Sequence, residues 1–178
     1  MAGIDSVGSR TIIVAILLVA ATWSNVTAAE VKRDLSVFFS GHLIAKGQFK
    51  NFIDGTKRGT TIDIRGGQTG KTFTLTENTT YSDGEKQRKV WKFTKLAEGR
   101  YIGRRSDLIG DATVEAKGQR IELNYAARVP SKDGTVRTLK FKETFSFTSA
   151  RTGTYVVRVW LSLLPVGEAR LSVQKQVR

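Results

Sequence analysis

Residues 120–147, RIELNYAARVPSKDGTVRTLKFKETFSF, decide the fold because apolar side chains recur there at every second position. These positions are Ile121, Leu123, Tyr125, Ala127 and Val129, followed by Leu139, Phe141, Phe145 and Phe147. A period of two is that of a β-strand with one buried face. The pair Asp133-Gly134 between the halves tolerates the positive φ angles of a tight turn. The stretch therefore predicts an antiparallel hairpin.

The same alternation extends in both directions along the chain. Further runs are Leu43–Phe49, Ile62–Ile64, Phe73–Tyr81, Trp91–Phe93, Tyr155–Leu161 and Ala169–Val173. Glycine-containing turns separate them at short intervals, at Asp54-Gly55, Arg65–Gly70, Ser82–Gly84, Glu98-Gly99, Lys117-Gly118, Arg151–Gly153 and Pro165–Gly167. Only Val31–Ser40 could form one or two helical turns. We therefore predict about ten strands in an antiparallel meander.

An open sheet of that size leaves unpaired edges, so we expect it to close. The predicted fold is an all-β, lipocalin-like barrel, and a two-sheet sandwich is the alternative. A membrane-spanning barrel would need a lipid-facing side without cations. The faces opposite the apolar ones instead carry Lys86, Arg88, Lys92, Arg120, Arg137, Lys140, Lys142 and Arg158. These charges favour a surface in water.

Residues 1–29 have the pattern of a secretory signal peptide. Arg10 precedes the apolar run Thr11–Ala21, and small residues follow it. A run of 11 residues is shorter than the roughly 20 that a bilayer-spanning helix needs. We therefore predict cleavage after Ala28 or Ala29, a single barrel domain over 30–178, and a periplasmic or secreted protein. An uncleaved N-terminal anchor is the alternative.

The composition narrows the classes of partner and site. The 178 residues include 29 Lys and Arg against 16 Asp and Glu, a net charge of +13, which favours anionic partners. Export makes nucleic acid an unexpected partner and leaves anionic lipids and acidic polysaccharides. The absence of cysteine excludes disulfides and thiolate metal sites. His42 is the single histidine, so we expect no metal site. We also expect no cofactor, and we expect a monomer.

Two acidic residues interrupt apolar faces. Glu77 lies between Leu75 and Thr79, and Glu143 lies between Phe141 and Phe145, so alternation points both carboxylates into the barrel. A buried carboxylate needs a cation or several donors, or it stays protonated. We interpret the pair as part of a ligand site; the alternative is structural pairing or a position near an open barrel end. The predicted ligand-binding residues are Glu77, Glu143, Tyr81, Arg65 and Asp107.

A basic stretch runs from Lys86 to Arg105 and contains one acid, Glu98. Trp91 and Phe93 have the opposite parity to the strand's outward lysines, so these aromatics should face the core. The residues predicted to bind an anionic surface are Lys86, Arg88, Lys92, Arg104 and Arg105. A solvated basic face without a partner is the alternative.

Several short motifs between Phe38 and Pro130 occur together. They are Phe39-Ser-Gly41, Ala45-Lys-Gly47, Phe73–Glu77, Tyr81–Glu85, Arg88–Trp91, Tyr101-Ile-Gly103, Asp107–Gly110 and Asn124-Tyr125. In these motifs the chain resembles the bacterial domain of unknown function 3833 family, whose members are mostly envelope lipoproteins. The resemblance implies an envelope location and no particular activity. This chain lacks the lipid-acceptor cysteine usual in the family.

These features lead to three functional hypotheses. The first is a non-enzymatic, lipocalin-like binder of a lipid or other amphipathic small molecule in the periplasm. The second is an envelope accessory protein with a filled barrel that binds anionic lipid or polysaccharide through its basic face. The third is an enzyme that uses the inward carboxylates.

Overall fold

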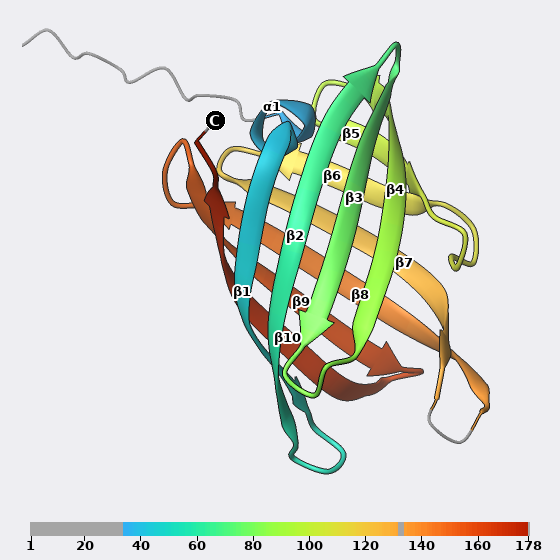
Figure 1. The fold of residues 1–178 in the computed structure, drawn as a ribbon. Coiled ribbons are helices and arrows are strands. Elements are labelled where there is room, and N and C mark those ends of the chain that lie inside the picture. Colours follow the sequence, from blue (N-terminus) through green and yellow to red (C-terminus); the bar gives the residue numbers. More distant parts are fainter. Residues whose placement is uncertain (1–33, 132–133, 178) are drawn as a thin grey trace, which may run out of the picture.

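The ten strands of the protein close into an antiparallel barrel (Figure 1). The computed structural model describes residues 34–131 and 134–177. Its elements are α1 (Leu35–Phe39), β1 (Gly41–Asn51), β2 (Lys57–Thr69), β3 (Thr72–Tyr81), β4 (Lys86–Ala97), β5 (Arg100–Arg104), β6 (Ala112–Lys117), β7 (Arg120–Pro130), β8 (Val136–Phe147), β9 (Thr152–Leu161) and β10 (Leu164–Lys175). The predicted fold class is confirmed. The predicted signal peptide lies outside the described residues.

Each strand pairs with the next along the chain, and β1 pairs with β10 to close the ring. The closing seam runs from the pair Leu43 and Lys175 to the pair Asn51 and Gly167. Gly47 is required at this seam, because a Cβ atom there would lie 1.9 Å from the carbonyl oxygen of Arg170. The seam thus depends on one close approach between two backbones.

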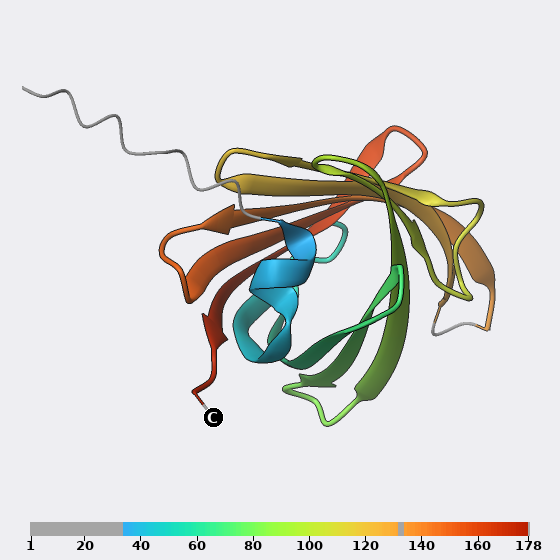
Figure 2. The ribbon, with the colours of Figure 1, turned by 90° about the horizontal axis from the view of Figure 1, so that it is seen from above.

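Helix α1 lies across one end of the barrel (Figure 2). The side chain of Asp34 accepts a hydrogen bond from the Ser36 backbone N–H at 2.9 Å and so caps the helix. Leu35, Phe38 and Phe39 are buried, a spacing that puts them on one helical face. Val31–Ser40 was predicted to form at most two helical turns, and α1 forms within this segment.

The two ends of the barrel differ in their contact with solvent. Near α1, the inward-facing Leu43, Ile121 and Phe145 are at most 1% exposed. Toward the other end, Phe49 and Phe141 also point inward but are only partly buried. We call this second end, which carries the β1–β2, β3–β4, β7–β8 and β9–β10 turns and the β5–β6 loop, the open end. Within the described part of the chain, no helix is long and apolar enough to cross a membrane.

Candidate functional site

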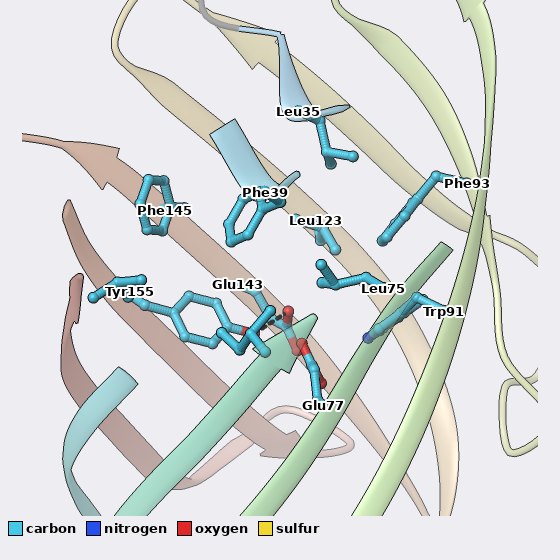
Figure 3. A pocket seen from close by; sticks show the side chains of 12 residues that line it. Leu35, Phe39, Leu75, Glu77, Trp91, Phe93, Leu123, Glu143, Phe145 and Tyr155 are labelled. Atoms are coloured by element: carbon cyan, nitrogen blue, oxygen red, sulfur yellow. Dashed lines mark hydrogen bonds between the residues drawn. The ribbon is translucent and has the colours of Figure 1, made fainter. Parts of the chain in front are cut away.

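Glu77 and Glu143 lie inside the barrel, where alternation along β3 and β8 predicts them. Glu77 is 9% exposed and Glu143 is 5% exposed. Both line one cavity, whose other walls are apolar or aromatic apart from the hydroxyl of Tyr155 (Figure 3). Those walls are formed by Leu35, Phe39, Ile64, Leu75, Trp91, Phe93, Leu123, Phe145, Tyr155 and Val173. The site is therefore a pair of carboxylates in apolar surroundings.

The carboxylate of Glu143 is held by two tyrosines from the strands on either side. Tyr125 of β7 donates its hydroxyl to Oε1, and Tyr155 of β9 donates its hydroxyl to Oε2 at 2.5 Å. Burial, followed by the neighbouring charge of Glu143, raises the pKa of both tyrosines well above the usual value of 10.0. They therefore stay protonated and act as donors. Both oxygens of Glu143 have a partner.

Glu77 is bound less completely. Within the described part of the chain it forms no ion pair. Burial, and next the nearby charge of Glu143, raise the pKa of Glu77 from 4.5 to about 7. The charges of Lys89 and Arg105 and a hydrogen bond from Trp91 act in the opposite direction. The protonation of Glu77 therefore changes near neutral pH.

Two cations accompany the carboxylates. Arg105, predicted on the basic outer surface, instead has its side chain inside, with 3% exposure. Its guanidinium lies 4.2 Å from the centre of the Trp91 ring and donates to both oxygens of Asp107 at 2.5 and 3.0 Å. Lys89 of β4 is paired in register with Glu77. Burial, and then the charge of Arg105, lower the pKa of Lys89.

These groups form one set, which we call the interior polar cluster: Glu77, Glu143, Lys89, Arg105, Tyr125 and Tyr155. Sequence reasoning selected the two glutamates and missed Lys89 and both tyrosines as site residues. The signal for Lys89 was present, because it shares its parity with the inward-facing Trp91 and Phe93.

The other predicted ligand-binding residues lie apart from Glu77. Arg65 is on the outer face of β2, where its Nε donates to Asp63 at 3.2 Å, so it does not reach the interior. Its position follows from parity, since Ile64 beside it faces the core. Tyr81 lies at the open end, with the guanidinium of Arg58 4.0 Å from its ring centre. Asp107 contributes indirectly, by holding Arg105.

The predicted anionic-surface residues divide between two environments. Lys86, Arg88 and Lys92 are exposed on the outer face of β4. Arg104 of β5 is the register partner of Lys92 and is also exposed, but Asp111 binds it at 2.9 Å. Arg105 belongs to the interior, as described above. The outer basic face therefore contains four of the five residues predicted for it.

Over residues 34–131 and 134–177, no group of three or more His, Cys, Asp or Glu side chains could hold a metal ion. His42 binds Asp63 through Nε2 at 2.7 Å.

The family assignment follows from a match over most of the chain. The model of the family described as "Protein of unknown function (DUF3833)" matches residues 14–153. The chain belongs to the DUF3833 family. A comparison with curated proteins gives no match.

Two solved structures show how widely this fold occurs. The first is the S-type phycobiliprotein lyase CPES from Guillardia theta, at 13% identity and a TM-score of 0.61, covering 84% of this chain and 96% of that one. The second is Rv2717c from M. tuberculosis, at 13% identity and a TM-score of 0.52, covering 78% of this chain and 93% of that one. At such low identity, this DUF3833 protein shares the fold with them and nothing further follows.

Proposed function

We propose that this DUF3833 protein binds a small amphipathic molecule, such as a lipid, inside its barrel. The observation that carries the proposal is Glu77, a carboxyl group that is buried among aromatic side chains and forms no ion pair within the described residues. A buried carboxylate without an ion-pair partner is costly to keep charged, and one hydrogen bond from Trp91 offsets only part of that cost. A ligand with a cationic or hydrogen-bond-donating head group would supply a further partner.

The cluster specifies what that head group should offer. Tyr125 and Tyr155 already occupy both oxygens of Glu143, so Glu77 has the greater free acceptor capacity. A hydroxyl, an amide N–H or an amine would satisfy Glu77 by donating a hydrogen bond. The apolar part of the ligand would lie against Trp91 and Phe93, which line the same cavity.

Binding requires the cavity to expand. The cavity volume is about 30 Å³, which is room for one or two water molecules. Leu35 and Phe39 of α1 line this cavity, so withdrawal of the helix would enlarge it. Few polar contacts oppose that movement: Lys95 binds Asp34 at 2.6 Å, and Lys175 donates to the carbonyls of Val37 and Phe38. We infer that α1 acts as a lid.

The test is native mass spectrometry of the protein purified from its own source. We expect an intact mass above the denatured mass, with the excess released as an extractable amphipathic compound. The matched variant Glu77→Gln preserves side-chain size and removes the charge, and should retain less of this compound. A chain with no excess mass from several growth conditions would contradict the proposal.

We also propose that the protein is exported and acts in the periplasm. The pattern of Arg10, the apolar run Thr11–Ala21 and the following small residues supports this location. Cell fractionation combined with N-terminal sequencing tests it. The expected result is a periplasmic protein that begins at Ala29 or Glu30. A cytoplasmic protein with an intact N-terminus would contradict it.

A second candidate function uses the outer surface. Lys86, Arg88 and Lys92 are exposed on one face of β4 and form no ion pair within the described part of the chain. Such a face attracts anionic lipid or acidic polysaccharide, with an affinity that falls as salt rises. The double variant Arg88→Glu and Lys92→Glu should abolish salt-sensitive binding to an acidic polysaccharide if this function holds.

A further inference from the structure

The open end carries large apolar side chains in contact with water. Phe52 and Ile53 in the β1–β2 turn are 46% and 67% exposed, and Leu163 and Leu164 at the β9–β10 turn are 90% and 60% exposed. The two turns are neighbours, since the Phe52 N–H donates to the carbonyl of Val166 at 3.0 Å. We call these four residues the tip patch. Hairpin tips in water are normally polar, so the patch requires an explanation.

The β9–β10 turn is also unusual in its backbone. Ser162 has a φ of 56° and is the single non-glycine residue with positive φ in the described part of the chain. The turns after β1 and β3 use glycines, Gly55 and Gly84, for this conformation. At the β9–β10 turn the strained position precedes Leu163, the most exposed large apolar residue described. The turn presents a leucine to the outside at a cost in backbone energy.

Two lysines and a tryptophan flank the tip patch, alongside the acidic residues Asp54 and Glu168. Lys50 and Lys57 are paired across β1 and β2 and are both exposed. The ammonium group of Lys50 lies 5.8 Å from the centre of the Phe52 ring. Trp160 of β9, partly buried, is paired with Pro165 of β10 next to the two leucines. Apolar residues flanked by lysine and tryptophan are typical of segments that enter the interfacial layer of a bilayer.

We propose that the tip patch inserts into the surface of an anionic lipid bilayer, with Lys50 and Lys57 against the phosphate groups. A membrane fits better than a second copy of the chain. Two tips of two residues each bury much less than the roughly 1,000 Å² that a stable protein interface needs, whereas shallow insertion needs only a few apolar side chains. The net charge of +13 also disfavours self-association and favours an anionic surface.

This inference does not depend on the proposed ligand, because the tip patch lies outside the cavity. If both hold, the end of the barrel that water reaches would face the bilayer. Failure of either one leaves the other testable, since native mass spectrometry reads the interior and vesicle binding reads the tips.

A fluorescent probe at single introduced cysteines tests the orientation. The chain has no cysteine, so Leu163→Cys gives one labelling site for an environment-sensitive fluorophore. The matched control is Leu96→Cys, because Leu96 is 62% exposed near the α1 end of β4. With vesicles of phosphatidylglycerol and phosphatidylcholine, we expect a blue-shifted, brighter emission at position 163 only. No response there, or an equal response at both positions, would overturn the proposal.

Vesicle flotation with unlabelled protein tests the residues themselves. Leu163→Ser with Leu164→Ser, and separately Lys50→Glu with Lys57→Glu, should each weaken binding at least about tenfold. The single variant Lys50→Glu should weaken binding more than Lys71→Glu, which makes an equal change of charge in the exposed β2–β3 turn at the opposite end of the barrel. Loss of binding in the Arg88→Glu and Lys92→Glu variant, with the tip variants unaffected, would overturn the proposal in favour of the β4 face. Wild-type dimerisation that the tip variants abolish would overturn it in favour of a second copy.

Discussion

Glu77 and Glu143 share one cavity but differ in their partners. Two tyrosine hydroxyls hold Glu143. For Glu77, burial and the charge of Glu143 raise the pKa more than the charges of Lys89 and Arg105 and the hydrogen bond from Trp91 lower it. The folded protein therefore binds a proton at Glu77 over a pH range in which the unfolded chain has released it. Stability and pH are linked through this residue.

We predict that Glu77→Gln stabilises the protein at high pH. The pKa of Glu77 is about 7 in the folded protein and near 4.5 in the unfolded chain. The contribution of Glu77 to the free energy of unfolding is therefore fully present below pH 4.5 and is lost as pH rises through 7. The variant lacks this loss and should be more stable than wild type by about 3 kcal/mol near pH 8, with no difference near pH 4. Urea denaturation across this range measures it. An unchanged wild-type pH dependence in the variant would contradict the assignment.

Parity along the strands could have predicted most of the cluster. It correctly turned both glutamates inward. Applied consistently, it also turns Lys89 inward with Trp91 and turns Arg65 outward beside Ile64. The meeting of Tyr125 and Tyr155 at Glu143 could not be predicted, because it depends on the register between β7, β8 and β9. Alternation gives the face of a residue but not its cross-strand neighbour.

At the scale of elements, α1 is bound by ring contacts more than by polar ones. The ring of Phe38 lies 4.7 Å from that of Phe145 and 4.8 Å from that of Phe147, measured between centres. The sequence predicted a short helical segment but not its place across the barrel end. The docking of α1 depends on aromatic residues of β8, more than 100 positions away in the sequence. Local periodicity predicts secondary structure but not contacts between segments so far apart.

We predict that Phe38→Ala releases α1. The side chain is 4% exposed, and its loss should lower the free energy of unfolding by about 3 kcal/mol. The matched change Val37→Ala, at a position 70% exposed on the same helix, should alter it by less than about 0.5 kcal/mol. Chemical denaturation gives both values. Faster hydrogen exchange confined to residues near α1 in the Phe38→Ala variant would identify the helix as the part released. Equal losses of stability in the two variants would contradict the prediction that Phe38 holds the helix in place.

At the scale of the whole molecule, the fold depends on the seam between the first and last strands. The number of strands and their meander were predictable from turn glycines and alternation. The nearly filled interior was not, because the cavity of about 30 Å³ depends on which side chains of α1 enter the barrel.

We predict that Gly47→Ala weakens the seam. The added Cβ atom would lie 1.9 Å from the carbonyl oxygen of Arg170, so β1 and β10 must separate locally. The expected loss is about 3 kcal/mol, at the upper end for an overpacked site. Gly67→Ala is the matched control, because its Cβ atom meets nothing within 4 Å. Thermal unfolding followed by circular dichroism compares them, and equal melting temperatures would show that the seam tolerates the atom.

The seam has a consequence for the order of the chain. A ring of nearest-neighbour pairings has no first strand, and β10 ends beside the start of β1, where the Gln176 N–H donates to the carbonyl of His42 at 2.9 Å. In a circular permutant, the ends are joined at this point and the chain is opened at the exposed turn between β6 and β7. Nine of the ten strand pairings would then still join strands that follow one another in the sequence. The strand order is cyclic, and the natural chain opens the ring at one of several turns.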